Sequence, residues 1–227
     1  RSPGGWREAG SFPELAELVL SNWLGDAGLG QAGFRDLLGD AFDFDVPLTR
    51  LSGDRWLLEL HHGPTLAFKD FGARFMARVM DALLQQAGQR LTIITATSGD
   101  TGSAVAAAFA GLSSTDVVLL YPAGRVSPLQ ELQLIVERPG VSALRVAGTF
   151  DDCQQMAKAV LSDPEVQSLG VSSANSINIG RLLPQQLYYL WALRQLPAGP
   201  APVFVVPSGN LGNLTAGVYA QLAGAGS

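Results

Sequence analysis

One lysine stands out among the residues whose side chains could do chemistry. Only two of the fifteen basic residues are lysines, Lys69 and Lys158, and the others are arginines. Arginine stays protonated at every working pH, whereas a partly desolvated lysine amine loses its proton and condenses with a carbonyl. Lys69 lies in the run LAFKDF (66–71), whose apolar side chains penalise a charge. We therefore predict an imine-forming role for Lys69; the alternative is a surface lysine at the start of a helix.

A strand–turn–helix pattern occurs twice, in IITATSGDTGSAVAAAFAG (93–111) and FVVPSGNLGNLTAGVYAQLAG (204–224). In both, an apolar strand runs into Ser-Gly-(Asp or Asn)-x-Gly and then into a helix of small residues. Glycines in such turns bring N–H groups close to a ligand, and the helix start adds unpaired donors and a positive dipole end. Both turns are candidate anion sites; the alternative is that they are only tight, capped turns.

The two turns differ in the anion that they suit. The turn 208–213 is the predicted phosphate site, whereas 97–102 carries the hydroxyls of Thr97, Ser98 and Thr101, which suit a carboxylate. Neither turn has the Walker or the dinucleotide-binding pattern, which argues against ATP and NAD. A condensable amine and a phosphate site together indicate a cofactor that has both an aldehyde and a phosphate, namely pyridoxal phosphate.

The elements that must position these residues alternate between strands and helices. We expect helices over 12–24 and within 34–44, and then a strand at 55–60 and a helix over 70–87. Further strands are predicted at 91–97, 116–121, 141–146 and 203–207, with helices over 101–111, 127–137, 150–162, 179–195 and 212–223 and a polar turn at 172–178. Uniformly apolar strands covered by helices predict α/β architecture with open, mostly parallel sheets.

Composition narrows the classes of function. The chain has 227 residues, 47% of them apolar and 15% charged, and a net charge of −5. This favours a packed globular protein and argues against a nucleic-acid-binding surface. A single cysteine fits a reducing compartment, so we expect a cytoplasmic protein, and no stretch is long and apolar enough to indicate membrane insertion. The few histidine and cysteine residues, His61, His62 and Cys153, predict no metal site.

Five motifs resemble the threonine synthases, which belong to the tryptophan-synthase-β-like group of pyridoxal-phosphate enzymes, called fold type II. They are ELHHGPTLAFKDFGARFMA (59–77), TATSGDTGSAVAAAF (95–109), YPAGRVSPLQELQL (121–134), SSANSINIGRLLPQQLYY (172–189) and VPSGNLGNLTAG (206–217). They occur in the family's order, with compatible gaps, from about residue 50 to the end. The resemblance implies a carbon–oxygen lyase of threonine biosynthesis that acts as a monomer or homodimer.

The resemblance also implies roles for particular residues. Lys69 would form the internal Schiff base with pyridoxal phosphate and shuttle protons. The cofactor phosphate would bind to the loop Ser208, Gly209, Asn210, Leu211, Gly212 and Asn213. The substrate's α-carboxylate would bind to the turn around Thr97, Ser98, Gly99, Asp100 and Thr101. The implied substrate is O-phospho-L-homoserine, which loses protons at Cα and Cβ, expels phosphate from Cγ and adds water at Cβ to give L-threonine.

The substrate's phosphate needs cationic or hydrogen-bonding groups of its own. Polar motifs shared with the family offer these candidates: Arg125, Asn175, Ser176, Asn178 and Arg181. Each has a structural alternative, such as a turn former or a surface ion pair. Asp70 is expected either to contact Lys69 or, more simply, to complement the helix N-terminus. His62 is expected to make a hydrogen bond and not to act as a base.

The resemblance implies three segments. Residues 1–54 would form a mainly helical N-terminal part, residues 55–90 with 172–227 would belong to the cofactor domain, and 91–171 would form a smaller α/β domain. The family's chains are markedly longer, so we expect this chain to be part of a longer protein. Two other functions remain open: a related lyase such as a serine or threonine dehydratase or a phospho-lyase, or an inactive binding module.

Overall fold

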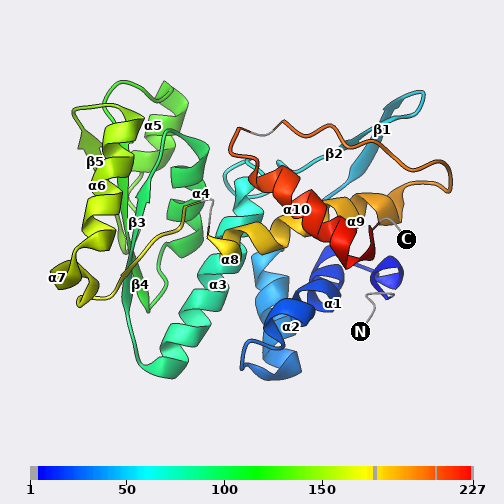
Figure 1. Ribbon diagram of the computed structural model, residues 1–227, viewed down its shortest axis with the longest axis horizontal. Helices are drawn as coiled ribbons and strands as arrows, with labels where there is room; N and C mark the ends of the chain where they lie inside the picture. The colour runs from blue at the N-terminus through cyan, green and yellow to red at the C-terminus, as the bar shows by residue number, and fades with distance from the viewer. Residues whose placement is uncertain (1–4, 176–177, 208, 226–227) are drawn as a thin grey trace.

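The computed structural model describes residues 5–175, 178–207 and 209–225, and one side of it is built around a four-stranded parallel sheet (Figure 1). The strand order is β5–β4–β3–β6. The strands are β3 (Leu91–Ala96), β4 (Thr115–Pro122), β5 (Val141–Val146) and β6 (Val171–Ser172). All three pairings are parallel, and Ile93 of β3 lies opposite Val117 of β4 and Ser172 of β6. The predicted α/β fold with an open parallel sheet is confirmed.

Helices cover both faces of this sheet (Figure 1). On one face, α6 (Phe150–Ser162) buries Cys153 and Ala157 against Ile94, Ala96 and Leu120. On the other face lie α3 (Lys69–Ala87), α4 (Asp100–Phe109) and α5 (Pro128–Ile135). Their buried side chains form a second apolar cluster with Ile93, Val117 and Leu119. The carboxyl ends of β3 and β4 therefore lead into the turns that begin α4 and α5.

A third apolar cluster, rich in aromatic residues, lies beyond α3. It joins α1 (Phe12–Leu24), α2 (Gly30–Ala41) and α9 (Gln186–Gln195) to one side of α3. The ring of Phe12 contacts Phe71 and Trp191 with centroids 5.4 and 5.7 Å apart. Because Phe71 packs here while Ala73 and Met76 pack toward the sheet, α3 is shared by two cores. The start of α3 is thus held from both sides.

The remaining elements are short and connect these parts of the fold. A 3₁₀ turn (Trp6–Glu8) precedes α1, and α7 (Pro164–Gln167) leads to β6. A short helix α8 (Ile179–Leu182) continues through the 3₁₀ turn η2 (Leu183–Gln185) into α9, and α10 (Gly212–Ala220) ends in a π-helical segment (Gln221–Ala225). None of the described helices is long and apolar enough to cross a membrane.

Four sequence predictions need correction. Residues 203–207, expected to be a strand, are irregular and have no described strand partner, and Val203 and Val205 are about 90% exposed. The strand at 55–60 is shorter, and β2 (Arg55–Leu58) pairs antiparallel with an unpredicted strand, β1 (Leu48–Ser52). The helix expected within 34–44 starts earlier, at Gly30. The expected turn at 172–178 overlaps β6, whose two residues are too few for a periodicity to reveal. Residues 176 and 177 of that turn lie outside the described residues.

Candidate functional site

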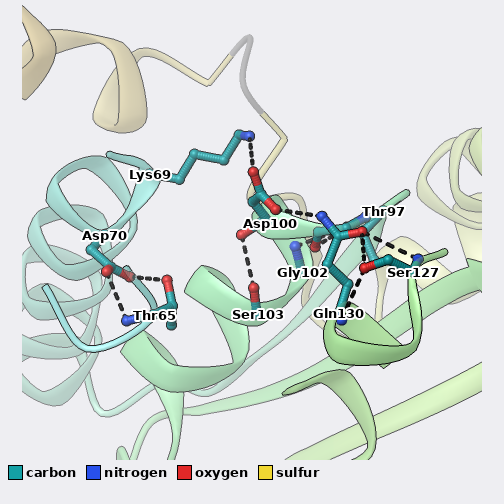
Figure 2. A network of polar contacts seen from close by, with 10 residues as sticks. Thr65, Lys69, Asp70, Thr97, Asp100, Gly102, Ser103, Ser127 and Gln130 are labelled. Atoms are coloured by element: carbon teal, nitrogen blue, oxygen red, sulfur yellow. Dashed lines mark hydrogen bonds and ion pairs between the residues drawn. The ribbon is translucent and has the colours of Figure 1, made fainter. Parts of the chain in front are cut away.

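The predicted lysine is the first residue of α3, and its amine reaches across to the start of α4 (Figure 2). Lys69 Nζ lies 3.5 Å from Asp100 Oδ2, and the Lys69 side chain is 25% exposed. The positive end of the helix dipole disfavours a cation at a helix N-terminus, so the position of Lys69 is unfavourable for a charged amine. Asp100 supplies the counter-charge. Phe68 shields one side, with its ring centroid 5.2 Å from the amine.

Asp100 connects the lysine to a third helix. Its Oδ1 accepts a 2.6 Å hydrogen bond from Gln130 Nε2, and Gln130 also forms the capping box of α5 with Ser127 (Figure 2). The N-termini of α3, α4 and α5 therefore meet around the chain of contacts from Lys69 through Asp100 to Gln130. Three converging helix starts favour an anion at this place. Gln130 was missed in the sequence, although the S-x-x-Q capping-box spacing was a usable signal.

The turn 97–102 is organised by a threonine that faces inward. Thr97 is buried, and its Oγ1 accepts hydrogen bonds from the N–H groups of Gly99 and Gly102 while donating to the carbonyl of Gly99. Its hydroxyl is thus engaged within the turn. Ser98 is exposed and Thr101 is half-buried, so neither residue is enclosed within the turn as Thr97 is.

The two glycines of this turn are required by close packing. A Cβ at Gly99 would lie 2.5 Å from Gln130 Nε2, and one at Gly102 would lie 2.4 Å from Thr97 Cγ2. Larger residues would push Gln130 and Thr97 away from the positions described above. The glycines therefore serve the contact between α4 and α5 as well as the tight turn.

Asp70 does not contact Lys69. It is fully buried and accepts hydrogen bonds from the backbone N–H and the hydroxyl of Thr65, at 2.9 and 2.6 Å. Burial raises the pKa of Asp70, and the bonds from Thr65 oppose this. Asp70 thus fixes the turn 63–68 that delivers Lys69, in which Leu66 adopts a left-handed conformation with φ of 60°. Neither expected role for Asp70 included this loop-fixing contact.

The second predicted turn opens α10. Ser208 lies outside the described residues; Gly209, Asn210 and Leu211 are exposed, and Gly212 and Asn213 are half-buried. Leu211 adopts φ of 56°, a conformation that costs free energy for a residue with a side chain. The first helical bond runs from Thr215 N–H to the Leu211 carbonyl, so helix geometry leaves the N–H groups of residues 212–214 without acceptors in the helix.

Two neighbouring tyrosines link this turn to the lysine. From α9, Tyr188 donates to the carbonyl of Phe68, and Tyr189 donates to the carbonyl and side-chain oxygens of Asn213. Burial raises the pKa of Tyr189 to about 12 and that of Tyr188 well above its usual value, so both hydroxyls stay protonated donors at neutral pH. Phe68, the tyrosines and Asn213 line one groove of about 660 Å³.

The candidates for an additional phosphate lie on separate segments. Arg125 is exposed after β4. Hydrogen bonds from Thr149 lower the pKa of Asp152, and the charge of Arg125 adds a smaller effect in the same direction. Asn178 is the N-cap of α8, accepting from Gly180 N–H, and its carboxamide nitrogen donates to the carbonyl of Ser173. Asn175 is half-buried, and Ser176 lies outside the described residues.

Arg181 is nearly fully buried at the end of α8. Its Nη1 donates to the carbonyl of Ala174, but its Nε has no hydrogen-bond partner among the described residues. Burial lowers the pKa of Arg181 to about 10. The group that opposes this lowering is the phenol of Tyr188, and not a carboxylate. A buried guanidinium with an unpaired donor is costly to the fold.

Comparison with known proteins identifies the family of this chain. Residues 46–226 match the family model described as pyridoxal-phosphate dependent enzyme. Threonine synthase from Escherichia coli K12 is 47% identical over 217 residues, covering 94% of this chain and 50% of the relative. Threonine synthase from Haemophilus influenzae is 48% identical over 202 residues, covering 88% and 47%. The chain therefore spans about half the length of the curated relatives that it matches.

Solved structures give the same result. The structure of pyridoxal-phosphate-bound threonine synthase from Brucella melitensis superposes with a TM-score of 0.90 at 40% identity, covering 99% of this chain and 50% of that one. Threonine synthase from E. coli gives 0.88 at 43% identity, covering 98% and 52%. The resemblance found in the motifs and the fold expected from it are confirmed. This chain belongs to the pyridoxal-phosphate dependent enzyme family.

Proposed function

We propose that the protein carrying this chain is a threonine synthase that converts O-phospho-L-homoserine and water to L-threonine and phosphate, with pyridoxal phosphate as cofactor. The observation that carries the proposal is the match at nearly half identity to threonine synthases over most of this chain, together with a lysine placed where three helices begin. We further propose a cytoplasmic protein that acts as a monomer or homodimer.

The residues present fit the cofactor. Its aldehyde needs an accessible amine, which Lys69 offers with its side chain partly exposed. Its phosphate needs a helix N-terminus with open space in front of it. The space beside Gly209 is open, because a Cβ added there would meet no atom within 4 Å. We propose that the loop from Ser208 to Asn213 holds this phosphate. The bonds from Tyr188 and Tyr189 support it, since they tie both segments to one helix.

When bound, pyridoxal phosphate supplies an electron sink for negative charge that develops on the substrate. The proposed part of Lys69 is to anchor the cofactor and afterwards to move protons at the substrate's Cα, Cβ and Cγ. Asp100 faces the lysine amine and would orient it between these positions. The Asp100 carboxylate is itself held by Gln130, so α5 would fix the lysine through Asp100.

The turn 97–102 is proposed to bind the substrate's α-carboxylate. Its Ser98 and Thr101 hydroxyls and the N–H groups at the start of α4 are the proposed donors. Thr97 is proposed to shape the turn without contacting the substrate, because its hydroxyl is engaged with Gly99 and Gly102.

For the substrate's phosphate we propose Arg181 ahead of Arg125, with Asn175, Ser176 and Asn178 as additional donors. The buried guanidinium of Arg181 is costly because its Nε has no hydrogen-bond partner in the part of the chain that the structure describes, and an anionic ligand would offset that cost. Asn178 already uses its side chain to cap α8. The proposed domain division remains that given by the sequence: residues 1–54, residues 55–90 with 172–227, and residues 91–171.

The test is turnover by the protein that carries this chain, loaded with pyridoxal phosphate. Equal release of phosphate and L-threonine from O-phospho-L-homoserine is expected. Formation of pyruvate from serine or 2-oxobutyrate from threonine, without activity on the phosphorylated substrate, would identify a dehydratase instead. Phosphate release without threonine would indicate a phospho-lyase, and cofactor binding without turnover of any of these substrates would favour a binding module.

A further inference from the structure

A cluster of three side chains of metal-ligating type follows β2, and one of them, His61, also lines the groove shared by Phe68 and Asn213. Glu59, His61 and His62 each offer one ligand atom, and these atoms all lie within 4.8 Å of one another. Glu59 Oε2 is 2.8 Å from His62 Nε2 and 3.8 Å from His61 Nε2. The two imidazole rings are stacked, with centroids 4.6 Å apart and planes inclined by 27°. Both nitrogens therefore approach the same carboxylate oxygen from neighbouring positions.

These separations suit a small tetrahedral ion. In an ideal zinc site the bonds are about 2.0 Å long, which places neighbouring ligand atoms about 3.3 Å apart. The observed distances of 2.8 and 3.8 Å lie on either side of that value. Small rotations of two side chains would equalise them, and both histidines have room because their side chains are 59% and 37% exposed.

The Glu59 carboxylate is held in place by a hydrogen bond to its other oxygen. Thr49 of β1 donates a 2.6 Å hydrogen bond to Glu59 Oε1, leaving Oε2 to face the histidines. Partners that fix a metal ligand from its far side are a regular part of metal sites.

We propose that Glu59, His61 and His62 bind a divalent transition-metal ion such as Zn²⁺, with water completing the coordination. Two imidazoles and one carboxylate are a ligand set that zinc takes in proteins, whereas Mg²⁺ and Ca²⁺ require oxygen ligands. The histidine and cysteine residues alone predicted no metal site, and Glu59 is the residue that completes the ligand set.

Such an ion would tie the β1–β2 hairpin to the turn that delivers the lysine. Glu59 is anchored to the hairpin through its N–H bond to the Pro47 carbonyl and through Thr49. His62 precedes Gly63, where an added Cβ would lie 2.6 Å from Asp70 Oδ2. Fixing His62 would therefore stiffen the 63–68 turn, and this effect depends on neither the cofactor nor the proposed reaction.

The test uses the chain without a polyhistidine tag and with zinc chloride as the probe. Calorimetric titration is expected to give one saturable site per chain, and magnesium chloride to give none. Because the chain has only two histidines, the two imidazole proton signals in an NMR spectrum report directly on the ligands. Both are expected to shift together as zinc is added.

Variants separate this site from surface binding. His62→Ala and Glu59→Gln are expected to remove saturable binding, and Thr49→Val to weaken it about tenfold through loss of the supporting bond. Asp54→Asn is the matched control, since it changes an exposed carboxylate of the same hairpin and is expected to leave zinc affinity unchanged. Zinc is also expected to raise the melting temperature of the wild type and the control but not of His62→Ala.

The proposal is overturned if zinc binds with the same stoichiometry and affinity to a double variant His61→Ala/His62→Ala, or if no saturable site is found. Equal binding of magnesium would also overturn it. Circular dichroism of each variant distinguishes a lost ligand from a lost fold.

Discussion

At the scale of single residues, the site depends on a few side chains whose partners differ from those expected. Lys69 pairs with Asp100 and not with the adjacent Asp70, because the first turn of α3 directs the two side chains to different sides (Figure 2). Asp70 holds the preceding turn through Thr65. Asp70 therefore fixes the turn that precedes Lys69, and Asp100 at the start of α4 supplies the counter-charge of the lysine amine.

The burial of Asp70 predicts a particular pH dependence. Its pKa is higher in the folded chain than the usual value near 3.8, chiefly because of burial. Such a carboxyl stabilises the fold below its unfolded pKa, and this contribution is lost as the pH rises through the folded pKa. The wild type's free energy of unfolding, measured in urea relative to Asp70→Asn, is therefore expected to fall over that interval and then level off. A difference that stays constant with pH would contradict this account of Asp70.

At the scale of elements, local sequence predicted most helices and three strands of the sheet. The predicted helix over 12–24 is confirmed. Ser11 caps its N-terminus, and Phe12, Leu15, Val19 and Leu20 are buried along one side of it. The prediction of a strand at 203–207 was wrong. It rested on β-branched composition, and a segment of that composition forms a strand only where a neighbouring strand pairs with it.

Within the candidate site, the sequence indicated Lys69 and both glycine turns from their types and spacing. It could not indicate the Lys69–Asp100 or Gln130–Asp100 contacts, because each joins residues about thirty positions apart. Tyr188 and Tyr189 were missed for the same reason: only the folded chain brings them to Phe68 and Asn213.

The packing of α3 against α8 gives a stability prediction. A Cβ at Gly72 would lie 2.7 Å from the carbonyl oxygen of Arg181, a backbone atom that cannot move without separating the two helices. Gly72→Ala is therefore expected to destabilise the fold by about 1–3 kcal/mol in urea unfolding. The control is Gly39→Ala in α2, where the added Cβ meets nothing within 4 Å and about 0.5–1 kcal/mol of stabilisation is expected. Equal stability of wild type and Gly72→Ala would contradict the close approach.

At the scale of the whole molecule, the described chain has two well-packed regions joined by α3 and one apolar segment that is exposed to solvent. Val203 and Val205 are almost completely exposed, and they line the groove that Phe68 and Asn213 also line. Exposed apolar segments of this kind promote association between chains.

This exposure predicts how the isolated chain behaves. The double variant Val203→Lys/Val205→Lys is expected to change stability by less than about 0.5 kcal/mol, because neither side chain is packed. It is expected to reduce self-association, measured by light scattering at increasing concentration. The control is Leu129→Lys, on the exposed side of α5, which is expected to reduce association less. Unchanged scattering of the double variant would show that this segment does not drive association.

The central claim is that Lys69 carries the cofactor. The direct measurement is to incubate the chain with pyridoxal phosphate, reduce with borohydride and locate the added mass by peptide mapping. The account predicts the label on Lys69, its loss in Lys69→Arg, which keeps the charge but not a condensable amine, and its retention in Lys158→Arg. A label on Lys158, or equal labelling of Lys69→Arg and wild type, would contradict it.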